Sequence, residues 1–371
     1  MLLDILKNLF FIVAGSAGIG FLIGFHELGH FIFCKLFKIR TPSFSIGFGP
    51  RLFERKIGDT VFALSAIPLG GYVEIAGAAE VGQGEQAEAH SNDQYSFAQK
   101  PYYQKMLVMA GGILFNLMFA YVTMIILFAT GIPKSPLLYP KNGTTIIETI
   151  APKSAAENAQ LLPGDNIIAV NNQPINNNIE ELLNIIEPLA DTEATVTIER
   201  ASETLHMPIT FASRTVGSRK IGVFGVGFVL QDIPAVSFKD AFNEGVHTVN
   251  TLIKNTFFMF KSMCVKKNIN GVGGPLMVIS ETIKGAAKGA KIFFLLLAFI
   301  SVNLAVLNML PLPIMDGGQA LFYTIEAIIR RPLPENVRLY IHYVCWVAIV
   351  ILAVYLSIKD IGTIATSLLA K

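Results

Sequence analysis

The chain has 371 residues, of which 52% are hydrophobic and 15% are charged. A soluble protein usually carries about 25% charged residues, so this composition excludes an ordinary soluble protein and places most of the chain in lipid. The net charge is +2 without a long basic block, so nucleic-acid binding has no support. Cys34, Cys264 and Cys345 have no C-x-x-C spacing, and they indicate neither a disulfide framework nor a cysteine zinc site.

Residues 1–38 predict a first membrane helix. A cleavable signal peptide is the alternative, because Lys7 precedes an apolar run and the Ala-Gly-Ser-Ala stretch at 14–17 resembles a cleavage site. The apolar character continues past that stretch to Phe25, which is longer than a signal peptide needs. We therefore expect an uncleaved span.

This span contains the pattern H-E-x-x-H at His26, Glu27 and His30. At helical spacing the two histidines lie one turn apart and leave the same face. Two neutral imidazoles suit Zn²⁺, and the adjacent carboxylate can act as a general base for the attacking water. Ionisable side chains are costly inside a membrane and are functional candidates by default. The motif predicts a catalytic zinc site; the alternatives are a chance match and a polar cluster that only pairs helices.

Residues 39–100 predict a membrane-associated β region followed by a polar loop over 77–96. Short strands are expected over 43–49 and 60–64, where apolar residues are bounded by Gly and Pro. The pair Gly70 and Gly71 before Tyr72 predicts a bend that another backbone can approach closely. Such a strand edge beside a protease site would hold a peptide. An ordinary hairpin cap beside the membrane explains the same residues.

Residues 101–132 predict the second membrane helix. The Ala-Gly-Gly stretch at 110–112 permits close approach of another helix, and Asn116 needs a partner across a helix interface. Helix association explains this asparagine as readily as a catalytic role does.

Residues 140–230 predict a water-soluble α+β insert. A strand over 144–150, a Pro-Gly-Asp turn at 163–165, an apolar strand, a helix over 178–190 and a strand over 195–200 follow one another. This order resembles a PDZ domain, whose groove binds an extended segment by strand addition. Gln160 stands where that pattern usually has glycine.

The remaining elements complete the predicted fold, a polytopic α-helical membrane protein with four transmembrane helices. Residues 237–263 repeat apolar side chains at intervals of three and four, which predicts an amphipathic helix on the membrane surface, with packing against the insert as the alternative. The third and fourth membrane helices are expected within 290–318 and over 339–358. Basic residues after the first and third spans place those loops in the cytoplasm and the insert outside.

A catalytic zinc site needs three protein ligands and an open position. Asp316 is the best remaining acid, because it lies in an apolar stretch that prolines and glycines interrupt. Irregular backbone at membrane depth is tolerated where it lines a cavity. His342 and Glu326 are the competing ligands.

Three features together resemble the site-2 protease family, and most closely its bacterial RseP-type branch. They are H-E-x-x-H in the first membrane helix, the PDZ-like insert, and N-x-x-P-x-P-x-x-D-G from Asn308 to Gly317. The resemblance covers nearly the whole chain. It includes the second-helix segment with Asn116, in which Gly112 replaces the usual proline.

The resemblance implies a role for each residue that matches the family motifs. His26, His30 and Asp316 would bind Zn²⁺, and Glu27 would act as the general base. Asn308 would contact the substrate backbone. The strand that contains Gly70, Gly71 and Tyr72 would hold a locally unwound substrate.

The implied function is intramembrane zinc proteolysis in the bacterial cytoplasmic membrane, with the active site toward the cytoplasmic leaflet. Expected substrates are single-span proteins that an upstream site-1 type protease has already trimmed, including anti-sigma factors of stress responses and remnant signal peptides. The PDZ-like unit would act as a size filter. One alternative is a non-catalytic PDZ membrane adaptor, although structural zinc sites usually have four Cys or His ligands. The other is an anchored peptidase with soluble substrates, which the depth of the motif disfavours.

Overall fold

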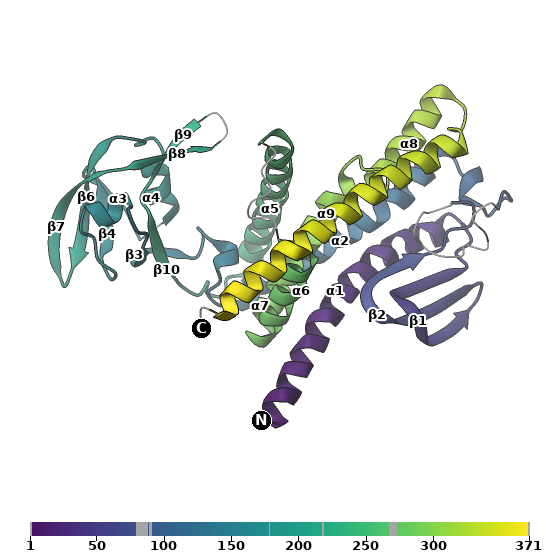
Figure 1. Cartoon of the computed structure of the whole chain (residues 1–371), viewed down its shortest axis with the longest axis horizontal. Helices are drawn as coiled ribbons and strands as arrows, with labels where there is room; N and C mark the ends of the chain where they lie inside the picture. Colours follow the sequence, from purple (N-terminus) through teal and green to yellow (C-terminus); the bar gives the residue numbers. More distant parts are fainter. Residues whose placement is uncertain are drawn as a thin grey trace. The chain divides into compact units, whose positions relative to one another are not determined.

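The computed structural model describes residues 2–78, 88, 91–177, 179–216, 219–266 and 273–369 (Figure 1). These residues form two units. Unit 1 comprises Met1–Ala129 and Ser237–Lys371, and unit 2 comprises Thr130–Val236. Most of the predicted polar loop and the first position of the helix predicted over 178–190 lie outside the described residues.

Four helices in the described part of the chain are long and apolar enough to cross a membrane, which confirms the predicted number. All four belong to unit 1, and they are α1 (Leu2–Leu36), α2 (Tyr102–Thr130), α7 (Ala290–Met309) and α9 (Glu335–Leu369). α9 continues beyond the predicted end at position 358. Its Asp360 carboxylate accepts hydrogen bonds from the amides of Gly274 and Met277, so a contact distant in sequence stabilises the added turns.

Glycines bring α1 and α2 into close contact. An added Cβ at Gly111 would lie 2.7 Å from the Gly29 carbonyl oxygen, and one at Gly29 would overlap the Gly111 carbonyl. Side chains at these positions would therefore push the two helices apart. Small residues serve the same purpose at helix crossings in other membrane proteins. The crossing brings the backbone of α2 within reach of the histidines of α1.

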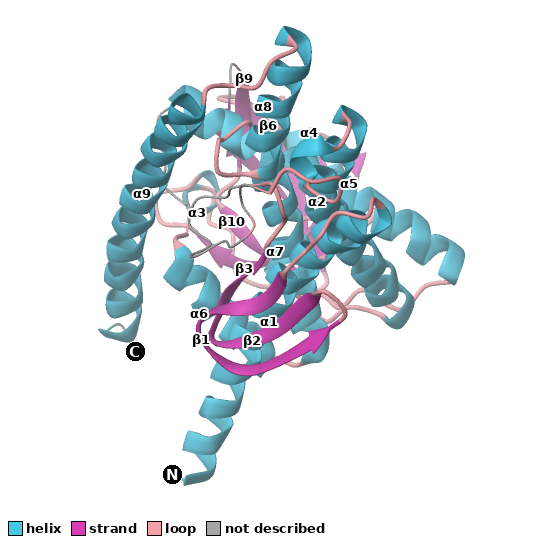
Figure 2. Ribbon diagram, turned by 90° about the vertical axis from the view of Figure 1, so that its right-hand side faces the viewer, coloured by secondary structure: helices cyan, strands magenta, loops and turns pink. Residues whose placement is uncertain are grey.

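The strands β1 (Ser43–Ile57) and β2 (Thr60–Val73) form a two-stranded sheet that lies beside α1 (Figure 2). Both strands are longer than predicted, so the predicted lengths were wrong. In β1 the reason is that Gly47 and Gly49, with positive φ values of 89° and 84°, bend the strand without ending its pairing. The bend places the start of β1 between two parts of β2. Ser45, for example, is paired with both Ala63 and Tyr72.

Three further helices complete unit 1: α5 (Phe238–Lys266), α6 (Pro275–Ala287) and α8 (Asp316–Ile329). The sequence predicted α5, whose Asn250 accepts a hydrogen bond from Tyr121 of α2 and whose Thr256 donates one to Asn303 of α7. Its location at a membrane surface stays a prediction. The helices α6 and α8 were not predicted. A short 3-10 turn, η1 (Phe97–Gln99), precedes α2.

Unit 2 contains a sheet with the strand order β10-β3-β4-β6-β7, in which β5 also pairs with β4. The 3-10 turn η2 (Pro136–Leu138) comes first, and two helices, α3 (Ala155–Asn158) and α4 (Ile179–Ile186), contribute to the core. The strands are β3 (Gly143–Ile150), β4 (Asn166–Val170), β5 (Gln173–Pro174), β6 (Glu193–Arg200), β7 (Glu203–Thr210) and β10 (Val226–Leu230), with a separate pair β8 (Ala212–Val216) and β9 (Arg219–Val223).

Gln160, which departs from the PDZ pattern, has a φ of 57°. This is the left-handed region that glycine adopts most readily. Its carbonyl oxygen accepts a hydrogen bond from the Arg200 guanidinium at 3.2 Å. A backbone conformation that favours glycine is therefore present here without a glycine.

Candidate metal centre

The two histidines of H-E-x-x-H lie one turn apart on α1 and point to the same side, as the spacing predicted. Both are buried, and their Nε2 atoms are 3.2 Å apart. Both side chains belong to the stretch Leu3–Leu36, which is long and apolar enough to cross a membrane. Two imidazoles are thus held together at a depth where polar groups need a specific partner.

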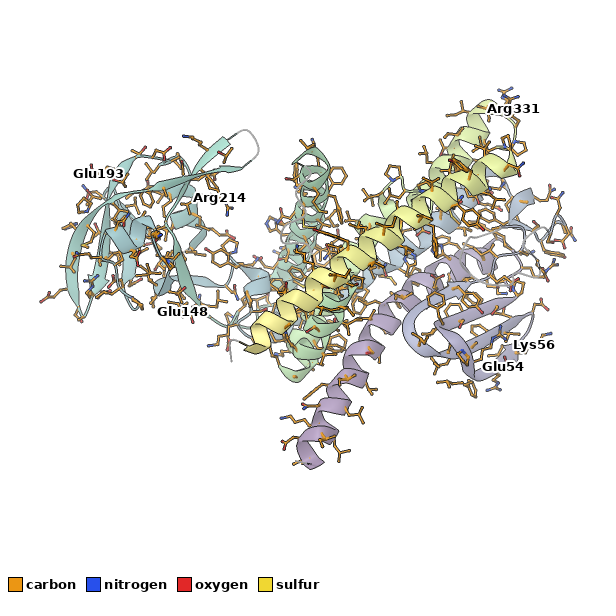
Figure 3. All side chains as sticks on the ribbon, in the orientation of Figure 1. Glu54, Lys56, Glu148, Glu193, Arg214 and Arg331 are labelled. Atoms are coloured by element: carbon orange, nitrogen blue, oxygen red, sulfur yellow. The ribbon has the colours of Figure 1, made fainter. Side chains whose placement is uncertain are left out.

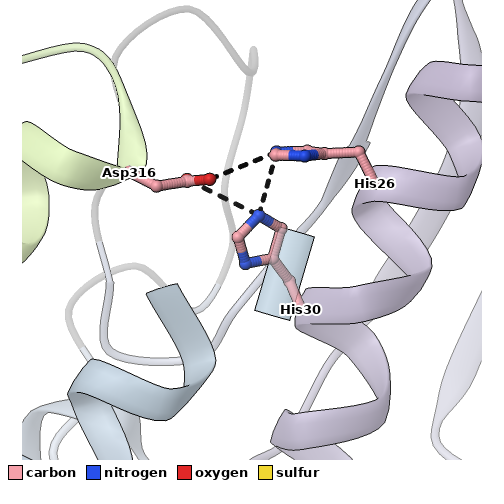
Figure 4. Close-up of side chains that lie close together, drawn as sticks. All are labelled: His26, His30 and Asp316. Carbon is pink, nitrogen blue, oxygen red and sulfur yellow. Dashed lines mark hydrogen bonds and ion pairs between the residues drawn. The ribbon is translucent and has the colours of Figure 1, made fainter. Parts of the chain in front are cut away.

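Asp316 meets the two histidines from a position almost 290 residues further along the chain (Figure 4). Its Oδ2 lies 3.3 Å from His26 Nε2, and its Oδ1 lies 3.5 Å from His30 Nε2. Asp316 is the first residue of α8. Gly317 and Gly318 follow it, and an added Cβ at either would overlap backbone carbonyls of the preceding segment, so only glycine lets the chain fold back this tightly.

His30 and Asp316 present lone pairs to each other. His30 Nδ1 lies 2.8 Å from the Val108 carbonyl oxygen. Since a carbonyl only accepts, Nδ1 carries the proton and Nε2 of the neutral ring presents its lone pair. Asp316 Oδ2 is buried and has no hydrogen-bond partner. Electron-rich atoms that face one another in this way repel unless a cation lies between them.

The spacing of the donor atoms fits Zn²⁺. A tetrahedral ion with bonds of about 2.0–2.1 Å separates neighbouring ligand atoms by about 3.3 Å. The two Nε2 atoms are 3.2 Å apart, and the two oxygens of Asp316 lie 3.3 Å from His26 Nε2 and 3.5 Å from His30 Nε2, respectively. Three protein ligands with the fourth position left for water or substrate is the arrangement of catalytic rather than structural zinc sites. His26, His30 and Asp316 therefore suit a catalytic zinc ion.

Asn116 of α2 faces the other nitrogen of His26. Its Nδ2 lies 3.1 Å from His26 Nδ1, while its Oδ1 is buried without a partner. When His26 binds metal through Nε2, Nδ1 carries the proton and needs an acceptor. A half-turn of the amide would bring Oδ1 to Nδ1 and satisfy both atoms, and the two amide orientations fit electron density equally well in most structures. Asn116 is thus placed to orient a ligand.

Gly112 leaves the space that the imidazole rings occupy. An added Cβ would lie 2.5 Å from His30 Nε2 and 2.6 Å from His26 Nδ1. Any side chain here would displace at least one ring unless the helix moved away. The sequence singled out this position as part of a small-residue stretch that permits close helix approach and as a departure from the usual proline, and the structure shows that the imidazole rings occupy the space beside it.

Glu27 lies beside the metal ligands and lines the same cavity, whose volume is about 240 Å³. The polar residues of its wall are His26, Glu27, His30, Asn116, Asn308 and Asp316, and the apolar ones are Ile23, Val73, Ile75, Leu304 and Ile314. The carboxylate of Glu27 is half-buried. A carboxylate at the edge of a small cavity next to three ligands is placed to act on a water molecule there.

Of the predicted substrate-binding residues, two lie at or beside the cavity and two do not. Asn308 lines the cavity, with its Nδ2 3.4 Å from His26 Nε2, and an added Cβ at Gly71 would lie 3.5 Å from Glu27 Cγ. Gly70 instead packs against Phe48, and Tyr72 alternates to the other side of the strand. Val73 lines the cavity, and the sequence had not singled it out.

The two competing ligands lie elsewhere. Glu326 accepts hydrogen bonds from the Leu333 amide and the Arg338 guanidinium. His342 is hydrogen-bonded to Gln319 and to the Arg338 carbonyl. Among the described residues, His26, His30 and Asp316 are the group whose ligand atoms all lie within 4.8 Å of one another.

A His-His-Asp cluster with an adjacent glutamate, held by apolar helices long enough to span a membrane, defines a membrane-bound, zinc-dependent hydrolase. The comparisons agree with this class. The model of peptidase family M50 matches residues 14–352. The chain belongs to this family, the site-2 proteases, and is a multi-pass membrane zinc metalloprotease.

Bacterial relatives named only as candidate zinc metalloproteases match most of the chain. One from Campylobacter jejuni is 31% identical over 356 residues, which cover 93% of this chain and 92% of the relative. One from Helicobacter pylori strain J99 is 32% identical over 337 residues, covering 86% and 90%. One from the cyanobacterium Nostoc is 28% identical over 368 residues, covering 96% and 97%.

Proposed function

We propose that this protein cleaves membrane-spanning segments of single-span proteins inside the bacterial cytoplasmic membrane. The observation that carries the proposal is the location of the site. Glu27 and the two histidines belong to a helix that is long and apolar enough to cross a membrane, and the cavity they line is bordered by α7 and by the end of β2. Substrates then enter from the lipid, as remnant signal peptides and the membrane segments of anti-sigma factors can.

The chemistry is peptide hydrolysis. When bound, Zn²⁺ supplies Lewis-acid catalysis, because it polarises the scissile carbonyl and lowers the pKa of water. Glu27 takes a proton from the attacking water and passes it to the leaving amine. Asn308 presents its amide beside His26, where it can donate a hydrogen bond to the substrate backbone. The apolar side chains of Ile23, Leu304 and Ile314 restrict the water that reaches the cavity.

A helical substrate hides its peptide bonds in internal hydrogen bonds, so it must unwind before cleavage. The end of β2 supports a role in this step. Gly71 pairs with Ile46 on one side and lies close to Glu27. An unwound segment could add to this strand and recover the backbone hydrogen bonds that it loses.

We assign unit 2 the role of a PDZ-like size filter on the extracytoplasmic side. The support is its order of turn, strand, helix and strand together with a hollow of about 500 Å³ between β5 and α4. Gln173, Pro174, Glu181 and Ile185 are among its lining residues. A hollow beside a helix and a strand suits an extended chain end, which a trimmed substrate presents.

The proposed orientation rests on basic residues. Figure 3 shows Arg331 at the turn between α8 and α9 and Lys56 on β1. These segments follow the third and first spans, where basic residues favour the cytoplasm. The active site then lies toward the cytoplasmic leaflet, and a site-1 type protease would act on the opposite side before it.

The test is cleavage of a model single-span substrate by the purified full chain in bilayers. One form of the substrate carries a folded extracytoplasmic domain, and the other is trimmed to a short tail. We expect cleavage of the trimmed form, little cleavage of the untrimmed form, and loss of both with a zinc chelator. Equal cleavage of the two forms would remove the size-filter role. No cleavage of either would favour the non-catalytic adaptor.

A further inference from the structure

His342 lies near the start of α9 and is almost completely buried, with a relative exposure of 4%. It is not part of the metal cluster. Its Nε2 lies 2.6 Å from Nε2 of Gln319, and its Nδ1 lies 2.7 Å from the Arg338 carbonyl oxygen. A buried histidine with both nitrogens engaged has a defined partner for each.

The donors and acceptors in this group can be assigned from the structure. The Arg338 carbonyl only accepts, so His342 Nδ1 carries the proton and Nε2 of the neutral ring accepts. The Gln319 amide nitrogen also lies 2.9 Å from the Pro313 carbonyl oxygen. Both neighbours of this nitrogen are therefore acceptors. The reverse amide orientation would direct an oxygen at a carbonyl, so Gln319 donates one hydrogen bond to each neighbour.

These two hydrogen bonds connect α9 to the segment that presents Asp316. Pro313 lies three residues before Asp316, and Gln319 lies three residues after it. The backbone of the segment also makes short-range hydrogen bonds: the Met315 amide donates to Leu312, and the Gly318 amide donates to Met315. The N-terminus of α8 has no side-chain cap. Apart from the contacts of Asp316 with the histidines of α1, the Gln319 side chain provides a hydrogen-bonded link from the described part of this loop to α9.

Neighbouring contacts hold the same part of α9 against α8. Arg338 donates a hydrogen bond to Glu326 at 3.2 Å, and its guanidinium lies 5.6 Å from the Phe322 ring. The His342 ring lies 5.5 Å from that of Phe322. His342 thus lies on a well-packed interface, where the position of its acceptor atom is fixed.

We propose that Gln319 and His342 are positioning residues for the zinc ligand Asp316. Gln319 braces the loop by donating to Pro313 and to His342, and His342 supplies the fixed acceptor. Without this brace the loop can shift and the Asp316 carboxylate loses its place opposite the two imidazoles. Outer-shell partners of metal ligands typically contribute 10–100-fold to metal affinity. The proposal concerns metal binding and does not depend on which substrate is cleaved.

The experiment measures zinc affinity and metal geometry in the full chain purified in detergent. Zn²⁺ binding is followed by competition with a chromophoric chelator, and the Co²⁺-loaded protein is followed by its visible absorption. The variants are His342→Leu, which removes the acceptor, His342→Gln, which retains an acceptor oxygen, and Gln319→Leu. Tyr343→Leu is the control, because Tyr343 is the next residue on α9 and is 58% exposed. Asp316→Ala provides the reference for loss of the ligand itself.

We expect His342→Leu to weaken Zn²⁺ binding about tenfold and Gln319→Leu to weaken it by about 10–100-fold, both with an altered Co²⁺ spectrum. His342→Gln should stay within about threefold of the natural protein, and Tyr343→Leu should match it. Unchanged affinity and spectrum in His342→Leu and Gln319→Leu would overturn the proposal. Equal losses in His342→Leu and His342→Gln would also overturn it, since packing rather than the acceptor would then be responsible.

The remaining outcomes separate this proposal from its premises. If Asp316→Ala binds Zn²⁺ normally, the ligand assignment on which the brace rests is wrong. If only Asp316→Ala loses Zn²⁺ affinity, Asp316 is a ligand, but Gln319 and His342 do not position it. If His342→Leu does not give a monodisperse protein, the other two variants still test the proposal. It requires that Gln319→Leu loses Zn²⁺ affinity and that His342→Gln retains it. None of these readouts uses cleavage, so they are independent of the proposed function.

Discussion

Asp165 in unit 2 and Asp316 in unit 1 differ in how their carboxylates are compensated. Asp165 in unit 2 has a side chain that is 1% exposed, and it accepts hydrogen bonds from the Arg200 Nε, the second Arg200 nitrogen and the Leu162 amide at 2.7–2.8 Å. Asp316 in unit 1 has a buried oxygen without any hydrogen-bond partner. Its neighbours are the Nε2 atoms of His26 and His30, which lie 3.3 and 3.5 Å from its two oxygens.

The difference separates a structural carboxylate from a ligand. Burying a carboxylate is costly unless hydrogen bonds or charges compensate. In unit 2 the fold itself supplies the compensation, so Asp165 stabilises the unit. In unit 1 the compensation is missing from the protein and must come from the metal. Changes around Asp316 should therefore affect metal binding and activity, and changes around Asp165 should affect stability.

The largest effect is expected from Glu27→Gln, which removes the base and leaves the metal ligands in place. Loss of a general base costs about 10²–10⁴-fold in rate. Cleavage of a trimmed single-span substrate should fall by that factor, while the zinc content of the purified protein stays at the natural level. Glu193→Gln, a change at a residue of unit 2 (Figure 3), is the control and should cleave normally. Full activity in Glu27→Gln would show that another group is the base.

The second prediction concerns the space at Gly112. Gly112→Ala should weaken Zn²⁺ binding by about 100-fold or more, because its Cβ would displace ligands directly, whereas outer-shell changes cost up to about 100-fold. The matched control is Gly362→Ala in α9, where an added Cβ meets no atom within 4 Å. Both are helical glycines, so the propensity gain is the same. If the two variants bind Zn²⁺ equally well, the helices adjust and the steric argument is wrong.

The third prediction concerns the orientation of His26. Asn116→Ala should weaken Zn²⁺ binding by about 10–100-fold, because the proton on His26 Nδ1 loses its acceptor. Asn116→Asp presents an oxygen in either orientation and should bind at least as tightly as the natural protein. A metal-competition titration of both variants checks this. Equal losses would contradict the acceptor role, because Asp keeps the shape and an oxygen of the natural side chain and lacks only its amide nitrogen.

The sequence predicted those parts of the site that depend on local geometry. His26 and His30 are one helical turn apart, so their common face follows from spacing alone. Asp316 could be chosen because few acids occur in apolar stretches. The four membrane helices follow from length and hydropathy.

The parts that depend on tertiary contacts were not predictable. The space that Gly112 leaves for the imidazole rings and the hydrogen bonds that Gln319 makes both depend on how α1, α2, α8 and α9 pack together. His342 was considered as a competing ligand at the start of the last membrane helix, but nothing in the sequence places its ring against Phe322 of α8. The first turn of α6 is held by Asp360, which is more than 80 residues away. The length of β1 escaped prediction because its glycines bend the strand without ending it.

The smallest effect is expected in unit 2, and it should appear in stability alone. Asp165→Asn keeps the shape of the side chain and removes its charge. Since Arg200 is 31% exposed, the loss should be near the low end for charged hydrogen bonds, about 1.5 kcal/mol. That corresponds to roughly tenfold faster hydrogen exchange of the core amides of unit 2. Cleavage of a trimmed substrate should not change. Asp191→Asn is the control, because the exposed Asp191–Lys220 pair contributes little.

The pH dependence of the same exchange sharpens this prediction. Burial by itself would raise the pKa of Asp165, but the hydrogen bonds from Arg200 and from the Leu162 amide outweigh it and hold the pKa below its usual range. The stabilisation is therefore complete above the unfolded pKa of about 3.9 and is lost as the pH falls through the lower pKa of the folded protein. In the natural protein, core exchange of unit 2, corrected for its intrinsic pH dependence, should accelerate on acidification. Asp165→Asn should lack this response, and an equal acid response in both proteins would mean that other groups of unit 2 control it.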